Sequence, residues 1–398
     1  MLWACPGPSR IVVPTPRAMA PPPAPDSSRP SADGEIEALS CEAAVERALA
    51  EHPALAAARA GQRVEWARAD AVPRIGAFEV RVRDELEAPG DGLRARVRWR
   101  LPTPGREGAQ VAAARERAKM SAAEILLLEA ALARDVRMRH LAVRMARHAQ
   151  QTAAKDAELM EADAQWRKTR VKGGMETELS AQTAVLRARD AQREQAAARR
   201  ALTAAEAAFA HDVGGPADAS QCADGPPPTP VADHPRVRAA LARARAVDQE
   251  GQAEVAANGL WPRFLELTWD RQEDTPDRTF LEVGIPLSLT GPALADVRDT
   301  AVARAKAELL SAVEETQRAI TLADANLRAR VAERDAVPPG KTVTAARAVA
   351  TQADAYGGDP RQRLALQRAL LREEAQRTRL VHAVEAASIR LRAARGHR

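Results

Sequence analysis

The chain contains the same unit twice, and this duplication limits its fold more than any other feature of the sequence. His52-Pro53 recurs as His234-Pro235, and Gly173-Gly174 recurs as Gly357-Gly358 at nearly the same separation. The His-Pro pair opens each unit and the Gly-Gly pair interrupts it at a corresponding place. A fold for this chain must therefore present one order of elements two times.

We expect four regions along the chain. Residues 1–36 are rich in Pro and form either a disordered N-terminal segment or the remnant of a lipoprotein leader. Two structural repeats follow, over 37–214 and 234–398, and a Pro-rich linker at 215–233 joins them. Cys5 follows a short sequence that resembles a bacterial lipobox and is a candidate lipidation site. The alternative is a Pro-rich tail with an incidental cysteine.

Each repeat contains a segment in which apolar and charged residues alternate. These segments cover about 77–101 in the first repeat and about 263–289 in the second. A period of two predicts strands with one apolar and one charged face, and the internal turn residues favour two hairpins. The strands are about 9 residues long, which is the length that a membrane barrel requires. The alternative is an amphipathic hairpin packed on a soluble core.

Helical segments surround the hairpins. A helix is expected after each His-Pro pair, with Ser40 or Asp233 as the N-terminal cap. Much longer helical segments follow the hairpins, over 105–173 and over 291–358, and Pro338-Pro339 interrupts the second. Each would extend roughly 100 Å at about 1.5 Å per residue. The chain then turns and returns as a shorter helix in both repeats.

Composition and charge argue against several classes of function, of which a nucleic-acid binder stays open as a third interpretation. Aromatic residues make up only 3% of the chain, and its abundant Ala, Arg, Glu and Leu are typical of long helices rather than of an enzyme core. Arg is interspersed with acidic residues and the formal net charge is only +5, so we do not expect nucleic acid as a partner. No catalytic residue and no cofactor is expected.

The cysteine and histidine pattern does not predict a metal site. His140 and His148 are interpreted as one side of a polar helix, and the three cysteines lack the spacing of metal ligands. Cys41 and Cys222 each lie near the start of one half of the chain. They either pair in an oxidising compartment or remain two unrelated thiols.

The order of these landmarks resembles that of the TolC-like outer-membrane efflux proteins, or outer membrane factors. The landmarks are a His-Pro helix, a strand hairpin, a long helix, a Gly-Gly turn followed by Leu-x-x-Gln at 179–182 and 364–367, and a return helix. All of them are duplicated, and the second hairpin carries Val-Gly-Ile-Pro-Leu at 283–287. The resemblance covers about residues 37–398 and rests on order and spacing rather than on any single motif.

The resemblance implies a mainly α fold with two β-hairpins. Three protomers would each contribute four strands to a twelve-stranded membrane β-barrel, and their helices would form a long α-helical coiled-coil barrel in the periplasm. The implied function is a passive trimeric export duct in the bacterial outer membrane, part of a tripartite efflux or type I secretion system. Its implied partners are outer-membrane lipid, a periplasmic adaptor protein and an inner-membrane transporter. The alternative is a soluble coiled-coil scaffold protein without channel activity.

The same resemblance implies two sets of site residues. The charged strand faces would line the barrel lumen, with Arg94, Arg96, Arg98, Arg100, Glu266 and Asp270 as its residues. The turns at 172–176 and 356–361 would form the periplasmic tip and gate, with Gly173, Gly174, Glu176, Glu178, Gly357, Gly358, Arg361 and Arg363 as their residues.

Superposing the two repeats aligns Glu176 with Arg361 and Glu178 with Arg363. We therefore expect acid–base pairs between alternating hairpins to latch the closed aperture. The alternative is that the glutamates only favour the positive end of a helix and that the arginines are scattered.

Overall fold

The computed structural model describes residues 38–71, 78–85, 92–222, 230–259, 261–272, 275–285, 291–337, 348 and 360–397. The chain divides into two units, Met1–Glu37 and Ala38–Arg398, and all the described residues belong to the second. The expectations for residues 1–36, including lipidation of Cys5, lie outside the described residues, as do the breaks at Pro338-Pro339 and Gly357-Gly358.

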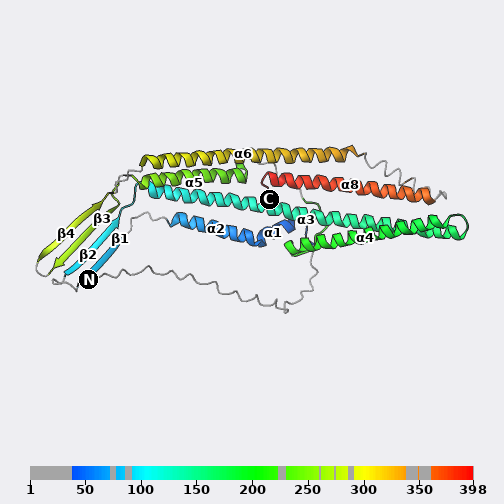
Figure 1. Ribbon diagram of the computed structural model, residues 1–398, viewed down its shortest axis with the longest axis horizontal. Coiled ribbons are helices and arrows are strands. Elements are labelled where there is room, and N and C mark those ends of the chain that lie inside the picture. The colour runs from blue at the N-terminus through cyan, green and yellow to red at the C-terminus, as the bar shows by residue number, and fades with distance from the viewer. Residues whose placement is uncertain are drawn as a thin grey trace, which may run out of the picture. The chain divides into compact units, whose positions relative to one another are not determined.

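The described chain is mainly helical and carries a small antiparallel sheet, as the sequence predicts (Figure 1). The first half contains α1 (Cys41–Glu51), α2 (Pro53–Asp70), β1 (Phe78–Glu85), β2 (Gly92–Arg100), α3 (Arg106–Lys172) and α4 (Glu178–Val213). The second half contains the short 3-10 turn η1 (Val231–Asp233), then α5 (Pro235–Ala257), β3 (Phe264–Gln272), β4 (Thr275–Gly284), α6 (Gly291–Ala336) and α8 (Pro360–Ala394). None of the described helices combines the length and apolar character needed to cross a membrane.

The His-Pro pairs are helix starts in which the histidine is itself the cap. The Nδ1 atom of His52 accepts a hydrogen bond from the Ala54 N–H at 3.3 Å, and that of His234 accepts one from the Arg236 N–H at 3.1 Å. Proline then occupies the first helical position, where its missing N–H costs nothing. The predicted caps of these two helices are therefore wrong. Ser40 caps the preceding helix α1 and Asp233 lies in the turn η1, so His52 and His234 take their places.

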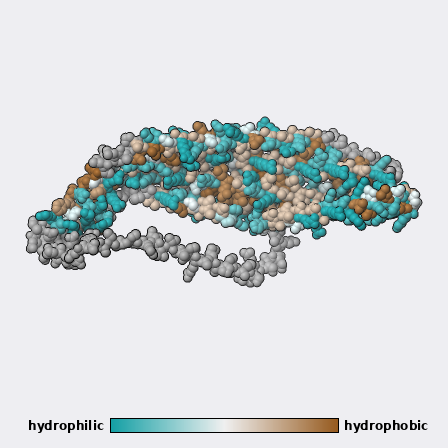
Figure 2. Space-filling view, in the orientation of Figure 1, coloured by the Kyte–Doolittle hydropathy of each residue, from teal (hydrophilic) through white to brown (hydrophobic). Residues whose placement is uncertain are grey.

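The long helix α3 confirms the continuous helix predicted for 105–173 and organises the other helices. It packs against α1, α2, α4, α5 and α8. Half of its buried residues are alanines, which allow neighbouring backbones to approach closely. On the face seen in Figure 2, hydrophobic and hydrophilic residues are intermixed over the helices. Helices of this kind depend on tertiary packing for their stability rather than on intrinsic propensity.

The largest side chain of the helical core is Phe209, which comes from α4 and is fully buried. It packs with residues of α1 and α3, among them Val45, Val136 and Val143. These contacts join the start of the first repeat to the middle of α3. The other buried residues of this cluster are alanines and valines, so Phe209 is its largest side chain.

The strands form a four-stranded antiparallel sheet in the order β1-β2-β3-β4, so that β2 and β3 join the hairpins of the two halves. Successive side chains of a strand point to opposite faces. The register therefore aligns Val80, Val97, Leu267 and Leu281 in one row on one face. This apolar row is exposed, from 38% at Val97 to 70% at Leu281. The helices of the same chain therefore leave this face open.

We expect Phe209→Ala to lower the free energy of unfolding by about 3–5 kcal/mol, because it removes a buried ring and leaves a cavity between α1, α3 and α4. Denaturant unfolding followed by helical circular dichroism would measure the change. Leu179→Ala is the comparison, because Leu179 is 76% exposed and its loss should change stability by less than about 0.5 kcal/mol. Equal stability of the two variants would contradict the core placed at Phe209.

Candidate functional site

The four arginines predicted for the lumen lie on one face of β2. Arg94, Arg96, Arg98 and Arg100 occupy alternate positions of this strand, so their side chains share a face. The register places Asp270 of β3 opposite Arg94 and Glu266 opposite Arg98 on the same face. The structure therefore brings all six predicted residues together in one charged surface, opposite the apolar row.

Glu266 is the centre of this charged surface. Only 4% of its side chain is exposed, and its two oxygens face two arginines of β2: Oε1 lies 2.7 Å from Arg96 Nε and Oε2 lies 3.6 Å from Arg98 Nε. Arg94 forms a separate pair with Asp270, with 2.9 Å between Nη2 and Oδ2. A carboxylate removed from water in this way is stable only with its cationic partners. The cross-strand pairs therefore fix β2 against β3.

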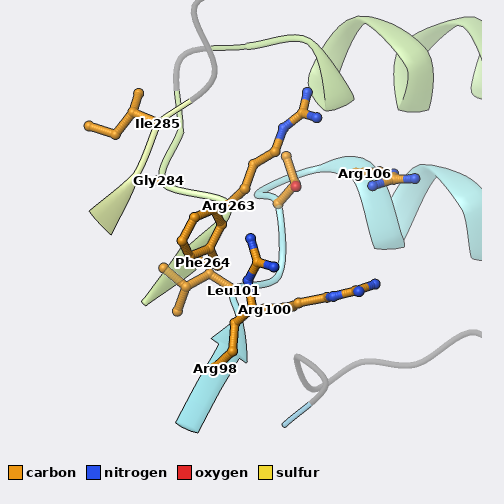
Figure 3. A pocket seen from close by; sticks show the side chains of 9 residues that line it. Arg98, Arg100, Leu101, Arg106, Arg263, Phe264, Gly284 and Ile285 are labelled. Atoms are coloured by element: carbon orange, nitrogen blue, oxygen red, sulfur yellow. The ribbon is translucent and has the colours of Figure 1, made fainter. Parts of the chain in front are cut away.

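A pocket of about 470 Å³ lies where the sheet meets the helices (Figure 3). Its lining includes four arginines, namely Arg98, Arg100, Arg106 and Arg263. The guanidinium carbon of Arg98 lies 3.8 Å from the centre of the Phe264 ring, which is a cation–π contact. Guanidinium groups grouped in this way favour phosphate and carboxylate groups.

Sequence reasoning identified two of these arginines and missed Arg106 and Arg263. Arg106 begins α3 and Arg263 precedes β3, so neither follows the alternating pattern that marks the strands. Both residues lie where a predicted strand and a predicted helix follow each other closely, and this position is the signal that could have indicated them. Gly284 belongs to the same pocket, and a side chain there would collide with the Phe264 ring.

The predicted tip residues of the first repeat lie in the turn between α3 and α4. Gly173 ends α3, and Gly174 has a left-handed backbone with φ of 69°, which glycine adopts without strain. The N–H of Met175 donates to the carbonyl of Arg170 at 2.9 Å and closes the turn. Thr177 then caps α4 by accepting a hydrogen bond from the Ser180 N–H at 3.3 Å.

Glu176 follows this turn and lies at the centre of a second charged cluster. Its side chain is 6% exposed and forms an ion pair with Arg361, close to the start of α8. Ser180 Oγ donates to Glu176 Oε1 at 2.7 Å, and Arg167 Nη1 lies 3.7 Å from the same oxygen. The Ser180 hydrogen bond, followed by Arg361, holds the pKa of the Glu176 carboxyl below its ordinary value, although burial acts in the opposite direction.

The other predicted tip residues are placed differently. Glu178 is exposed in the first turn of α4, and Arg363 is exposed on α8. Trp166 was not predicted as part of this cluster, yet the guanidinium carbons of Arg170 and Arg361 lie 4.9 Å and 5.7 Å from the centre of its indole ring. A lone tryptophan within a long helical pattern gives no signal for such a contact.

The structure also resolves the alternatives left open for the cysteines. Cys41 and Cys222 form a disulfide, with their Cα atoms 5.1 Å apart. This bond ties the start of α1 to the segment that follows α4. The interpretation of His140 as part of a polar helix side is wrong, because its side chain is fully buried. His148 lies beside His382 of α8, with 6.4 Å between the ring centres.

No protein-family model matches the chain, and no curated protein matches it in sequence. Solved structures do match it. CusC, described for its folding and transmembrane channel formation, is 14% identical with a TM-score of 0.69, and the match covers 90% of this chain and 92% of that chain. The outer membrane protein VceC from Vibrio cholerae is 16% identical with a TM-score of 0.65 over 90% of this chain and 96% of that chain. The open MtrE outer membrane channel of Neisseria gonorrhoeae is 16% identical with a TM-score of 0.69, and the match covers 90% of this chain and 89% of that chain.

This chain has the fold of these outer-membrane channels. The likeness covers nearly the whole of the second unit and of the three matched chains. At this level of sequence identity, the likeness establishes the fold. The fold predicted from the order of the sequence landmarks is therefore confirmed.

We expect Glu266→Gln to destabilise the sheet by about 1–3 kcal/mol, because it leaves Arg96 and Arg98 without their shared buried carboxylate. The measurement is the temperature at which the β signal in circular dichroism is lost in detergent. Glu282→Gln is the matched comparison, since Glu282 lies opposite Glu266 in the register but is exposed. Removing this like charge should leave the sheet as stable or slightly more stable. A larger loss from Glu282→Gln than from Glu266→Gln would contradict the assignment.

Proposed function

We propose that the protein is the outer-membrane channel of a tripartite efflux or type I secretion system. It would form a homotrimeric, passive export duct for small molecules, metal ions or proteins. The observation that carries this proposal is the shared fold with CusC, VceC and MtrE over 90% of the chain. Because these neighbours are channel proteins, the comparison also supports a role without enzymatic activity.

The sheet supports the trimer on physical grounds. In the order β1-β2-β3-β4 the outer strands β1 and β4 each have a neighbour in the chain on one side only. Unpaired backbone groups are not tolerated in hydrocarbon, so an open sheet cannot lie in a membrane. Four strands from each of three copies would close a twelve-stranded barrel in which every strand is paired on both sides.

The two faces of the sheet support its orientation in such a barrel. The exposed row that includes Val80, Leu267 and Leu281 would contact outer-membrane lipid. The charged face, with Arg94, Arg96, Arg98, Arg100, Glu266 and Asp270, would line the watery lumen. Carboxylates pair with arginines on this face, so the lumen need not be strongly selective for anions.

The helical part supports a periplasmic extension. The two repeats, proposed over 37–214 and 234–398 with a linker at 215–233, would supply the helices of a coiled-coil barrel. Its tip, near Gly174 and Glu176, would meet a periplasmic adaptor protein and, through it, an inner-membrane transporter. The Cys41–Cys222 disulfide is in keeping with an oxidising compartment such as the periplasm.

Cell fractionation followed by reconstitution tests the proposal. We expect the protein to accompany the outer membrane, to be extracted as a trimer by detergent, and to lose a β signal only on heating. The purified trimer should conduct ions across a planar lipid bilayer. A chain that stays soluble, remains helical without a β signal and does not conduct would overturn the proposal in favour of a coiled-coil scaffold.

The Glu176–Arg361 pair supports a latch at the tip, and its reversal is a direct test. Glu176→Arg should raise the conductance of the trimer, because it places a further cation beside Arg361 and Arg167. Adding Arg361→Glu to this variant should restore much of the low conductance, since the pair is rebuilt with its charges exchanged. Glu178→Arg is the comparison, and its effect should be smaller because Glu178 is exposed. Conductance that is the same in all variants would exclude the latch.

The latch should also depend on pH. In the folded protein the pKa of Glu176 is lowered from its ordinary value of 4.5. The stabilisation that the ionised Glu176 gives to the latch is therefore complete above this ordinary value. It is lost as the pH falls through the lowered pKa, because protonation removes the negative charge that Arg361 faces. Conductance should therefore rise on acidification below about pH 4.5, and Glu176→Gln should show high conductance with little of this pH dependence.

A further inference from the structure

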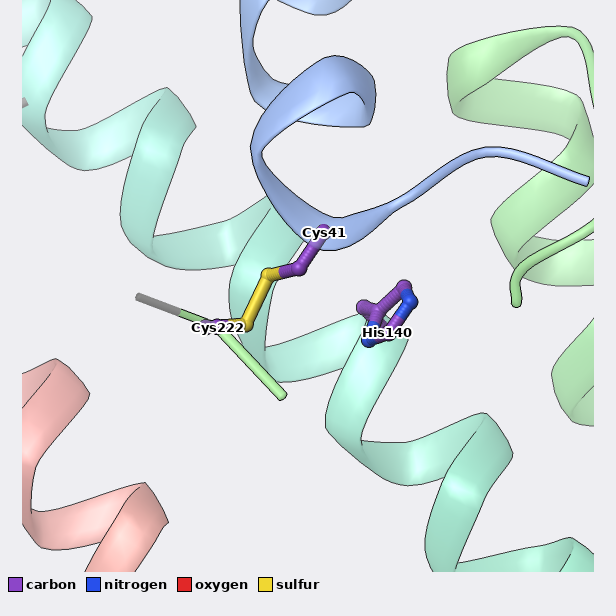
Figure 4. Close-up of side chains that lie close together, drawn as sticks. All are labelled: Cys41, His140 and Cys222. Atoms are coloured by element: carbon purple, nitrogen blue, oxygen red, sulfur yellow. A yellow bond between two sulfur atoms is a disulfide. The ribbon is translucent and has the colours of Figure 1, made fainter. Parts of the chain in front are cut away.

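Cys41, His140 and Cys222 come from three separate parts of the chain and meet in the helical core (Figure 4). Cys41 is the first residue of α1, His140 lies in the middle of α3, and Cys222 follows α4. Their exposed fractions are 1%, 0% and 8%. A ring nitrogen of His140 and the two sulfur atoms all lie within 4.8 Å of one another. The three side chains therefore form a compact, buried group of sulfur and nitrogen atoms of the kinds that ligate metals.

Asp218 sets the orientation of the histidine. His140 Nε2 lies 3.2 Å from Asp218 Oδ1, and this oxygen also accepts hydrogen bonds from the Ser220 N–H at 2.8 Å and the Ser220 hydroxyl at 2.6 Å. An ionised carboxylate only accepts hydrogen bonds, so Nε2 carries the proton. The lone pair of the neutral imidazole is then on Nδ1.

This Nδ1 atom is the unusual feature of the site. It is buried, and among the residues that the structure describes it has no hydrogen-bond partner. Buried polar atoms are normally satisfied, and an exception calls for an explanation. The His140 ring makes an edge-to-face contact with Phe209, with 5.6 Å between the ring centres. Phe209 covers one side of the imidazole with apolar atoms and offers no hydrogen bond to Nδ1. A structural disulfide alone does not require a histidine with a free lone pair.

We propose that Cys41, His140 and Cys222 form a redox-gated binding site for a thiophilic divalent cation of the Zn²⁺ type. The disulfide form is closed to metal, and the dithiol form binds it through two sulfur atoms and Nδ1. Two thiolates and one imidazole are a common ligand set for zinc. The hydrogen bond from Nε2 to Asp218 matches the carboxylate–histidine–metal arrangement, in which the carboxylate holds the ring and raises its basicity.

Opening the site is a balanced two-electron step. A dithiol reductant breaks the sulfur–sulfur bond, transfers two electrons and two protons to Cys41 and Cys222, and becomes a disulfide itself. The cation then displaces both thiol protons to solvent, so that metal binding is favoured at higher pH. With Zn–S bonds of about 2.3 Å, tetrahedral geometry places the sulfurs about 3.8 Å apart. The two side chains must therefore rotate apart when metal enters.

Zinc binding to the full-length, detergent-purified protein tests the site in its two redox states. A phosphine reduces the disulfide without competing for zinc as a dithiol would; it takes oxygen from water to become a phosphine oxide, and both sulfurs become thiols. Titration with Zn²⁺ against a chromophoric chelator should show one more equivalent bound per chain after reduction than before. Equal zinc binding by the oxidised and reduced protein would overturn the proposal.

Variants separate this site from adventitious binding. His140→Ala should abolish the additional equivalent, and Asp218→Asn should weaken its affinity 10–100-fold, the usual effect of removing a carboxylate behind a ligating histidine. His211→Ala is the matched control, because His211 is also a helical histidine beside an aspartate but its side chain is 88% exposed. Undiminished binding by folded His140→Ala would exclude His140 as a ligand and overturn the proposal.

A measurement on the unmodified sequence avoids any folding defect of the variants. In the reduced protein, Zn²⁺ should slow the alkylation of Cys41 and Cys222 at least 10-fold, as measured by mass spectrometry of peptides. The same reduced protein alkylated without zinc is the reference. Alkylation of Cys41 and Cys222 at rates independent of zinc would also overturn the proposal.

Discussion

The packing of α3 is the interaction on which the rest of the described fold depends. This helix has 67 residues and contacts α1, α2 and α4 from the first half of the chain and α5 and α8 from the second. In proteins, most of the stability of a helix comes from tertiary packing, and the buried alanines of α3 allow several neighbours to approach closely. Because these neighbours come from both halves of the chain, α3 holds the two halves together. The sheet and the α3–α4 turn lie next to the two ends of α3, so the packing of this helix determines where they lie.

The sheet carries a second constraint, which one chain does not satisfy. Its apolar row is left open by the helices, and β1 and β4 remain edges. The charged face is instead well satisfied within the chain, because Glu266 and Asp270 neutralise arginines across the β2–β3 pairing. The protomer thus supplies ion-pair partners for the charged face of its sheet itself. The apolar face and the edge strands need contacts from outside the protomer. This division is the physical basis for the proposed oligomer in lipid.

Much of the fold was predictable because local rules determine it. The period of two marked the strands, the glycines at 105 and 173 marked the ends of α3, and the duplication gave the order of elements. The same period placed four arginines on one face of β2, because alternate residues of a strand point to the same face. The burial of Glu266 between Arg96 and Arg98 was not predictable, because it depends on the register between two strands that are far apart in the chain.

By itself, the sequence determined which segments form helices and strands, which strand face is charged, and that the two halves are alike, because each follows from neighbouring residues or from comparing the halves. Only the tertiary structure decided which distant side chains meet. It joined Cys41 to Cys222 and set His140 beside them, and it brought Trp166 under the arginines near Glu176. Such contacts depend on the rotation and sliding of long helices against one another, and alanine-rich surfaces carry little information about either in their sequence.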